Sequence, residues 1–361
     1  MALWDPREGP PSLSVVKPVY TGAMPTLDDA RIAENEANGR ETVMTFDTNV
    51  LGQIYKFAMM GGRAEFLAEL GLDQLIAVLS RPNQRRMVLA AGIAFQELPP
   101  SMIFSFERVY EWFVSRFLPG YGDHPLILPA LLSTPQSVHG FWDRSPDCQI
   151  AFASSYSWLL LLQVVLVDDS ERDPMVRFQR FVDLAITKTG GLGPKEIEVA
   201  RWCLSPPIAQ DEAYNRRRKA IIQNFAGKGA PRSVDDLKHR ALNGADDLWL
   251  MTSAAFMERR GLQGIPQDIW IVTYDKKLAE YCRVFSYLPA GNLTGFLAVC
   301  TSIPSEHDSG YWQQSAQWFY EFQRRPRQDR QDEDHAKLEL VRRCETLVET
   351  FGSSKFSSLE R

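Results

Sequence analysis

Two aspartates in this sequence each follow a short apolar, β-prone run and precede a segment with helical character. Asp47 follows the run at 43–46, and Asp275 follows the run at 271–274. In an open parallel sheet, the carboxyl ends of neighbouring strands face one crevice, where ligands bind. Two carboxylates in such a crevice repel one another unless a proton or a divalent cation holds them. The pattern therefore favours a Mg²⁺ or Mn²⁺ site at Asp47 and Asp275.

Two further acids could complete such a site. Glu97 lies in a helical segment after a second apolar run at 87–91, and Asp246 and Asp247 precede a helix with a continuous apolar face. Asp247 lies on that apolar face, which favours it over Asp246 as the acid that points into the crevice. Each acid also has an ordinary interpretation as a helix cap or a solvated helix residue. The alternatives to Glu97 as the central acid are Glu65, Glu69 and Glu107.

Composition sets limits on the classes of protein to consider. The 361 residues carry a net charge of −5, so a nucleic-acid partner would need a local basic patch. The five cysteines are scattered without a C-x-x-C pair, which argues against a zinc site and a disulfide framework. The longest apolar stretch, at 158–167, is about half a bilayer span and indicates a buried helix. With no signal-like N-terminus, we expect a soluble, cytoplasmic protein without a membrane partner.

The sequence pattern predicts a discontinuous α/β domain at 41–100 and 230–305. Residues 1–40 are expected to form an extended arm, and strands are expected at 42–46 and 269–273. The run at 87–91 fits a strand or a short buried helix, and 286–301 is expected to close the sheet. We expect three α/β/α layers: a central, mostly parallel sheet with helices on both faces.

The remaining sequence is predicted to be helical. Residues 101–229 are interpreted as a large helical insertion, with its last helix at 212–225, and 306–361 as a C-terminal helical tail. Ser233 resembles an N-cap for a helix that ends near Asn243 and Gly244. Asp246 and Asp247 are then expected to begin the next helix.

Three segments resemble the PIN domain family of metal-dependent nucleases, which includes the toxin ribonucleases of toxin–antitoxin modules. The segments are 46–51 (FDTNVL), 247–254 (DLWLMTSA) and 272–275 (VTYD). The order of acids is also similar: an Asp at the first strand, a central Glu, an Asp at a helix start and an Asp after a valine–threonine strand end. The resemblance covers less than half of the chain, and the separation of about 130 residues between the second and third acids is unlike the compact family domains.

The resemblance implies a Mg²⁺- or Mn²⁺-dependent nuclease, with an endoribonuclease favoured over a deoxyribonuclease, and a role as a toxin or defence effector. Mg²⁺ prefers hard oxygen ligands and keeps several waters, so two or three carboxylates suffice to hold it. Asp47 and Asp275 would then bind the metal directly, and Glu97 and Asp247 would bind it through water, hold a second ion or orient the attacking water. The expected supporting residues are Thr48, Asn49, Asp246 and Thr273.

Two basic clusters are candidates for contacts with an RNA substrate. The stronger cluster comprises Arg216, Arg217, Arg218 and Lys219, and the weaker one is Arg85–Arg86. A solvated helix face explains the stronger cluster equally well. The sequence leaves open a homo-oligomer and an inhibitory protein partner.

Two other functions stay open. A non-catalytic relative would keep the fold as an RNA-binding or scaffold protein without turnover. A phosphatase with an aspartyl nucleophile at Asp47 would ordinarily need a second acid two residues later, and this chain has Asn49 at that position.

Overall fold

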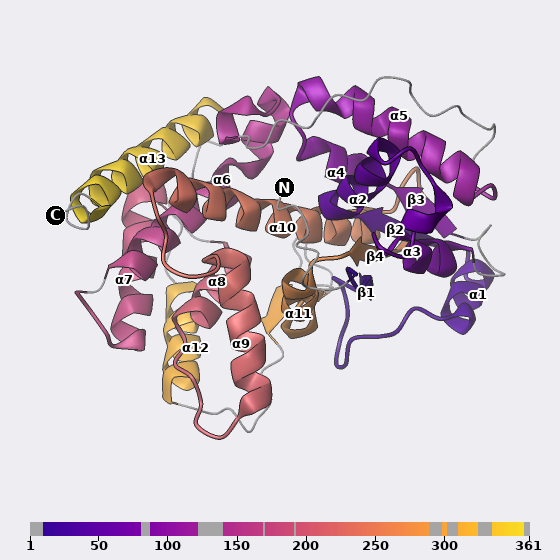
Figure 1. Ribbon diagram of the computed structural model, residues 1–361. Helices are drawn as coiled ribbons and strands as arrows, with labels where there is room; N and C mark the ends of the chain where they lie inside the picture. Colours follow the sequence, from indigo (N-terminus) through magenta and orange to yellow (C-terminus); the bar gives the residue numbers. More distant parts are fainter. Residues whose placement is uncertain are drawn as a thin grey trace. The chain divides into compact units, whose positions relative to one another are not determined.

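The computed structural model describes residues 10–80, 87–121, 140–168, 170–190, 193–288, 298–301, 310–323 and 334–356 (Figure 1). The chain divides into two compact units. The first unit combines Met1–Ser145 with Leu250–Ala298, and the second combines Pro146–Trp249 with Val299–Arg361. Each unit is described by itself.

The first unit is built on a four-stranded open sheet with the order β1-β4-β2-β3. The central strand β2 (Glu41–Phe46) pairs in parallel with β3 (Met87–Ala90) and with β4 (Gln267–Thr273). The short strand β1 (Ser14–Val16) is antiparallel to β4 at one edge. The expected mixed α/β class, with a mostly parallel sheet, is confirmed, and the run at 87–91 is a strand. All seven residues of β4 are buried, as in a parallel strand covered on both faces.

A large aromatic core covers one face of this sheet. The helices α2 (Thr48–Met59) and α5 (Pro100–Phe117) pack together there, and the rings of Tyr55 and Phe106 stack at a centroid distance of 4.2 Å. Phe46 and Val272 belong to the same core. Most aromatic residues of 104–117 therefore belong to the core or pack against it, but the side chain of Phe104 is 66% exposed.

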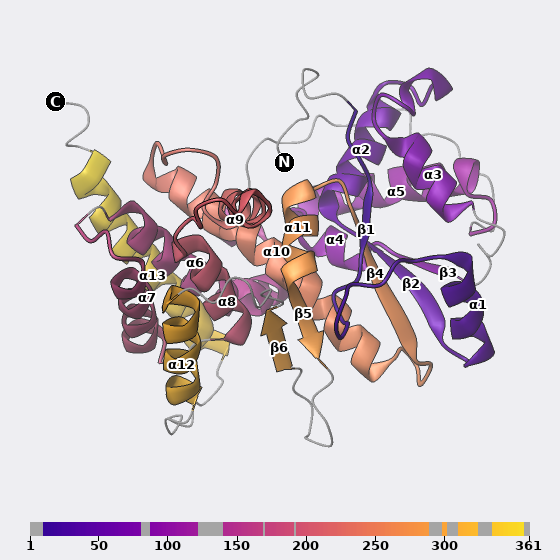
Figure 2. The same cartoon turned by 90° about the horizontal axis from the view of Figure 1, so that it is seen from below.

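The other elements of the first unit surround the sheet (Figure 2). The helix α11 (Lys276–Val284) packs against β1 and β4. The remaining helices are α1 (Asp29–Ala37), α3 (Leu72–Leu79), α4 (Gly92–Gln96) and the last part of α10 (Val234–Arg260), from Leu250 on. Short 3₁₀ turns lie at Ala64–Phe66 and Phe141–Asp143.

Two predictions for the ends of this sheet are wrong. Residues 10–40 are not simply an extended arm, because they contribute β1 and α1 to the first unit. The strands β5 (Phe285–Leu288) and β6 (Ala298–Thr301) lie outside the four-stranded sheet, so 286–301 does not close it.

The second unit is helical in its described residues. Its helices are α6 (Pro146–Val167), α7 (Pro174–Thr189), α8 (Pro194–Leu204), α9 (Glu212–Phe225), the first part of α10 (Val234–Arg260), α12 (Gly310–Gln323) and α13 (Asp334–Phe356). α6 contacts α7, α8 and α13. α9 has the predicted bounds, and Asp173 caps α7 by accepting the N–H of Met175 at 2.8 Å.

α6 is long and apolar enough to cross a membrane by length and composition. Within its most apolar window, however, 72% of the residues are buried inside the protein. Leu160, Leu161 and Leu162 are fully buried. α6 is therefore a core helix of the second unit, which confirms the prediction of a buried helix at 158–167.

The unit boundaries differ from those expected. α5 belongs to the first unit through its contacts with α2, so the second unit begins at Pro146 and not at residue 101. The helix α13 packs on α6, which makes it part of the second unit and not a separate tail.

α10 is one continuous helix, and the expected break at Asn243 and Gly244 is wrong. A Cβ atom at Gly244 would lie 2.9 Å from the Phe225 ring and 3.0 Å from Leu159. Gly244 therefore permits close packing and does not end a helix. The predicted start is correct, since the Ser233 hydroxyl accepts the Asp236 N–H at 3.1 Å.

Candidate functional site

Three strand ends bring the candidate residues of the first unit to one edge of the sheet. Phe46 of β2 is in register with Val272 of β4, and the Asp47 N–H donates to the Val272 carbonyl at 3.0 Å. Asp47 therefore follows β2 beside the end of β4, and Asp275 follows β4 by two residues. Glu97 comes after the third parallel strand, β3, at the end of α4. The candidate acids therefore follow the carboxyl ends of parallel strands, the edge of an open sheet at which ligands commonly bind.

Asp47 is buried, and its two carboxylate oxygens differ in their contacts. Oδ2 accepts a hydrogen bond of 2.5 Å from the Thr273 hydroxyl and another from the Asn49 amide. Oδ1 accepts a long hydrogen bond of 3.4 Å from the Asn49 N–H, through which Asp47 caps α2. Two strong donors thus fix Oδ2, and Oδ1 keeps capacity for a further ligand.

Asp275 caps α11 in the same way that Asp47 caps α2. Its Oδ1 accepts the N–H groups of Lys277 at 2.6 Å and Leu278 at 3.2 Å. Its Oδ2 lies 3.6 Å from Nζ of Lys277. The side chain of Asp275 is 28% exposed, so this carboxylate lies closer to solvent than that of Asp47.

Asn49 joins the ends of β2 and β4. Its amide donates to Asp47 and, at 3.1 Å, to the Thr273 hydroxyl. Its carbonyl oxygen accepts the Tyr274 N–H at 2.9 Å. The expected supporting residues Asn49 and Thr273 are therefore hydrogen-bonded to the site acid, and they hold two sequence-distant strand ends together.

The electrostatics of the site disfavour a charged Asp47. Burial raises the pKa of Asp47 to about 6, and the negative charge of Asp275 adds to the rise. Hydrogen bonds from Thr273 and Asn49 oppose it. The two aspartates therefore interact electrostatically, as expected for paired carboxylates at neighbouring strand ends.

Glu97 contacts Thr48, the residue that follows Asp47. The Thr48 hydroxyl lies within hydrogen-bond distance of the Glu97 carboxylate and of the Ala94 carbonyl. Glu97 is half-buried, whereas the alternative acids Glu65, Glu69 and Glu107 are exposed. Of these four glutamates, Glu97 is therefore the least exposed, and it contacts the residue next to Asp47.

Asp246 and Asp247 belong to the second unit. Both lie inside α10, so neither begins a helix as predicted. The Asp247 carboxylate accepts a hydrogen bond of 2.6 Å from the Asn224 amide of α9. This contact gives Asp247 a structural role within the second unit.

The basic cluster lies on α9 and divides into two kinds of residue. Arg216 and Lys219 are exposed, whereas Arg217 and Arg218 are half-buried. The guanidinium of Arg218 donates to the Ser205 carbonyl at 2.6 Å. Arg218 therefore helps to hold the second unit together, and Arg85–Arg86 lies outside the described residues.

A cluster of four metal-binding carboxylates is not seen. No group of three or more His, Cys, Asp or Glu side chains among the described residues is arranged to hold a metal ion. What the first unit contains is the pair Asp47 and Asp275. A pair still suits Mg²⁺, which binds through one or two carboxylates and completes its shell with water and substrate phosphate. A buried carboxylate whose charge is disfavoured fits the same cation, because the cation would compensate that charge.

One residue beside the pair, Lys277, is not among the residues predicted from the sequence. Lys277 follows Asp275 by two positions and directs its ammonium group toward Oδ2 of that residue. The signal was the Lys276–Lys277 pair directly after the second aspartate. Nothing in the sequence distinguished the two lysines, but Lys276 is exposed and Lys277 is half-buried.

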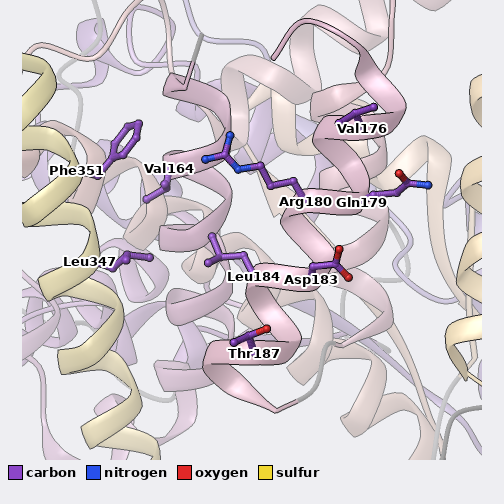
Figure 3. A pocket seen from close by; sticks show the side chains of 9 residues that line it. All are labelled: Val164, Val176, Gln179, Arg180, Asp183, Leu184, Thr187, Leu347 and Phe351. Atoms are coloured by element: carbon purple, nitrogen blue, oxygen red, sulfur yellow. The ribbon is translucent and has the colours of Figure 1, made fainter. Parts of the chain in front are cut away.

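A cavity of about 550 Å³ lies in the second unit, and none of the predicted acids lines it (Figure 3). Residues of α6, α7 and α13 line it, including Val164, Leu184 and Phe351. Arg180 at its rim forms an ion pair of 2.5 Å with Asp168. This cavity is a mostly apolar groove between helices and has no acid pair of the kind found at the sheet edge.

No family model, curated protein or solved structure matches this chain. The assignment of a function therefore depends on the chemistry of the site itself.

Proposed function

We propose that the first unit is a PIN-like, metal-dependent nuclease that hydrolyses phosphodiester bonds. The observation that carries the proposal is the pair Asp47 and Asp275 at the carboxyl ends of two adjacent parallel strands. RNA is the proposed substrate on the strength of the sequence resemblance to PIN domains. A cytoplasmic toxin or defence effector is the corresponding biological role.

Oδ1 of Asp47 and Oδ2 of Asp275 are the oxygens that would hold a Mg²⁺ or Mn²⁺ ion. When bound, the ion would lower the pKa of a water molecule and offset negative charge on the phosphate. Thr273 and Asn49 restrain Asp47 so that Oδ1 keeps its orientation. In metal-binding carboxylates, one oxygen typically accepts hydrogen bonds from neighbouring residues while the other binds the metal.

Glu97 is the proposed proton acceptor. In hydrolysis, the water oxygen forms a bond to phosphorus, the phosphorus–oxygen ester bond breaks, and the water proton passes to Glu97. The leaving oxygen then takes a proton from solvent. Thr48 would keep the carboxylate of Glu97 oriented for this step. Asp247 is not included in this mechanism, because its carboxylate accepts the Asn224 amide.

Cleavage of end-labelled single-stranded RNA in Mn²⁺ tests the proposal. The wild-type protein should cleave the RNA, and EDTA, Asp47→Asn or Asp275→Asn should abolish cleavage. Asp29→Asn is the matched control, because Asp29 is an exposed acid of the same unit on α1. The proposal fails if Asp47→Asn and wild-type preparations cleave equally. Asp247→Asn in the same assay should retain cleavage, and its loss would return Asp247 to the mechanism.

One observation favours a non-catalytic alternative. The described residues contain no group of three acids that could hold a metal, as a relative without turnover would also show. Under this alternative, the protein binds labelled RNA without metal-dependent cleavage. A phosphatase is less well supported, because its chemistry would ordinarily need an acid at position 49 to transfer a proton. Asn49 is an amide, and its side chain bridges two strand ends. Trapping a phospho-aspartate at Asp47 would revive it.

A further inference from the structure

Lys277 is placed to interact with whatever binds between the paired carboxylates. It lies in the first turn of α11, and its Nζ approaches Oδ2 of Asp275 to 3.6 Å. That separation exceeds a strong charge-assisted hydrogen bond of about 2.7–2.9 Å. Among the described residues, Asp275 is the single ionic partner of Lys277. The ammonium group is therefore loosely held, and its side chain is 31% exposed.

The ammonium group and a metal ion would use the same oxygen. Oδ1 of Asp275 is already occupied by the N–H groups of Lys277 and Leu278, at 2.6 Å and 3.2 Å. Oδ2 is the oxygen left for a cation, and it is the oxygen that Lys277 faces. Two positive charges near this atom repel one another, so a bound divalent cation would displace the ammonium group.

We propose that Lys277 compensates Asp275 while the metal is absent and contacts a substrate phosphate once the metal is bound. This inference rests on the proposed nuclease function for its second half. A phosphate oxygen accepts strongly from an ammonium group, and lysine acts as a mobile point charge on a flexible stem. The same residue thus competes with the metal in the free protein and assists the substrate in the complex.

The two roles predict opposite effects of one substitution. Lys277→Met keeps most of the length of the unbranched side chain and removes its charge. Mn²⁺ should bind the free Lys277→Met protein about two- to fivefold more tightly than wild type, because a competing surface cation is gone. The kcat/KM for RNA cleavage should fall about 10- to 100-fold, because a charged hydrogen bond to phosphate is lost. A residue with a merely structural role would not improve metal binding.

The experiment uses the full chain after treatment with a chelator. Binding of Mn²⁺ is titrated by the electron paramagnetic resonance signal of the free ion, without RNA, and cleavage of labelled RNA is measured separately. Lys276→Met is the matched control, because Lys276 is exposed and has the same charge. It should leave both measurements unchanged. Lys277→Arg keeps a positive charge and should retain wild-type Mn²⁺ affinity, and it guards against a folding defect specific to methionine.

The outcomes separate this inference from the proposed function. Equal Mn²⁺ affinity in Lys277→Met and Lys276→Met, or no Mn²⁺ binding in any protein, overturns the competition. If Lys277→Met binds Mn²⁺ more tightly but cleaves RNA as well as wild type, the proposed phosphate contact is wrong and the proposed nuclease function still stands. If the wild-type protein binds Mn²⁺ but cleaves no RNA, the proposed nuclease and the phosphate contact fail together, and the Mn²⁺ titration alone still decides the competition.

Discussion

The Thr273 hydroxyl donates a hydrogen bond of 2.5 Å to the Asp47 carboxylate, across a sequence separation of 226 residues. The same hydroxyl oxygen accepts the Asp275 N–H at 2.8 Å. One side chain therefore contacts both acidic residues of the candidate site. Partners of this kind orient carboxylates without touching a substrate themselves. The geometry of the acid pair thus depends on a residue with no acid–base chemistry of its own.

Thr273→Val keeps the shape of the side chain and removes its hydroxyl. We expect the free energy of unfolding to fall by about 1–3 kcal/mol, because Asp47 and the Asp275 N–H each lose a buried partner. Mn²⁺ affinity should also fall, because Asp47 is less restrained. Urea unfolding and Mn²⁺ titration measure the two effects. Thr273→Ser is the control, since it keeps the hydroxyl and loses one methyl group worth about 1 kcal/mol. Equal Mn²⁺ affinity in both variants would contradict a positioning role.

Asp47 should make the stability of the metal-free protein depend on pH. Its pKa is about 6 in the folded protein, against an ordinary value of 3.8. An acid with a raised pKa contributes its stability fully below the unfolded value, and the contribution is lost as the pH rises through the folded value. From these two pKa values, the loss between pH 4 and pH 7 is about 2 kcal/mol.

The measurement is urea unfolding of metal-free wild type and Asp47→Asn at pH 4, 5, 6 and 7. Other carboxylates titrate in the same window, so the difference between the two proteins isolates the contribution of Asp47. We expect the variant to gain stability relative to wild type as the pH rises. Parallel curves would show that the carboxylate of Asp47 is not penalised by burial.

The local sequence was sufficient to predict the elements around the acid pair. An apolar run followed by an aspartate marks β2 and β4 because a buried parallel strand is apolar throughout and its carboxyl end is followed by a helix cap. Asp47 and Asp275 are such caps. The same local logic predicted α9 at its observed bounds.

Other features were decided by contacts between distant residues. β1 has three residues, too few for a recognisable pattern, and its partners on β4 are Ile271, Val272 and Thr273. The close contact of Gly244 with Phe225 cannot be predicted from the local sequence either. A glycine in a helical pattern is readily interpreted as the end of the helix. Lys277 differed from Lys276 only after α11 had oriented the two side chains.

Gly244→Ala tests the explanation for the unbroken helix α10. Alanine normally stabilises a helix by about 1 kcal/mol relative to glycine. Here the new Cβ atom would meet Phe225 at 2.9 Å and Leu159 at 3.0 Å, and overpacking of this kind costs about 1–3 kcal/mol. We therefore expect a net loss of stability in thermal unfolding. Gly92→Ala in α4 is the control, because nothing lies within 4 Å of its new Cβ, and stability should be kept or improved. A more stable Gly244→Ala protein would contradict the close packing.

A second polar network lies at the amino end of β4, around Asp268, which is fully buried. Its carboxylate accepts two hydrogen bonds from Arg31, at 2.8 and 2.9 Å, and forms an ion pair of 2.8 Å with Lys17. Burial alone would raise the pKa of Asp268, but the hydrogen bonds from Arg31 and Lys17 hold it well below its usual range. The network attaches the N-terminal residues to the sheet, and it lies at the strand end opposite the acid pair.

Asp268→Asn should therefore separate stability from metal binding. The substitution removes the negative charge that pairs with the buried ammonium group of Lys17. Breaking a buried ion pair lowers the free energy of unfolding by about 3–5 kcal/mol. Mn²⁺ affinity of the folded protein should stay the same, because the strand from Asp268 to Thr273 spans roughly 17 Å. Urea unfolding and Mn²⁺ titration give the two values, and Glu34→Gln, an exposed acid on α1, is the control with little expected change. A loss of Mn²⁺ affinity with an unchanged free energy of unfolding would mean that the two ends of β4 are coupled. That result would contradict the independence of the paired carboxylates and this network.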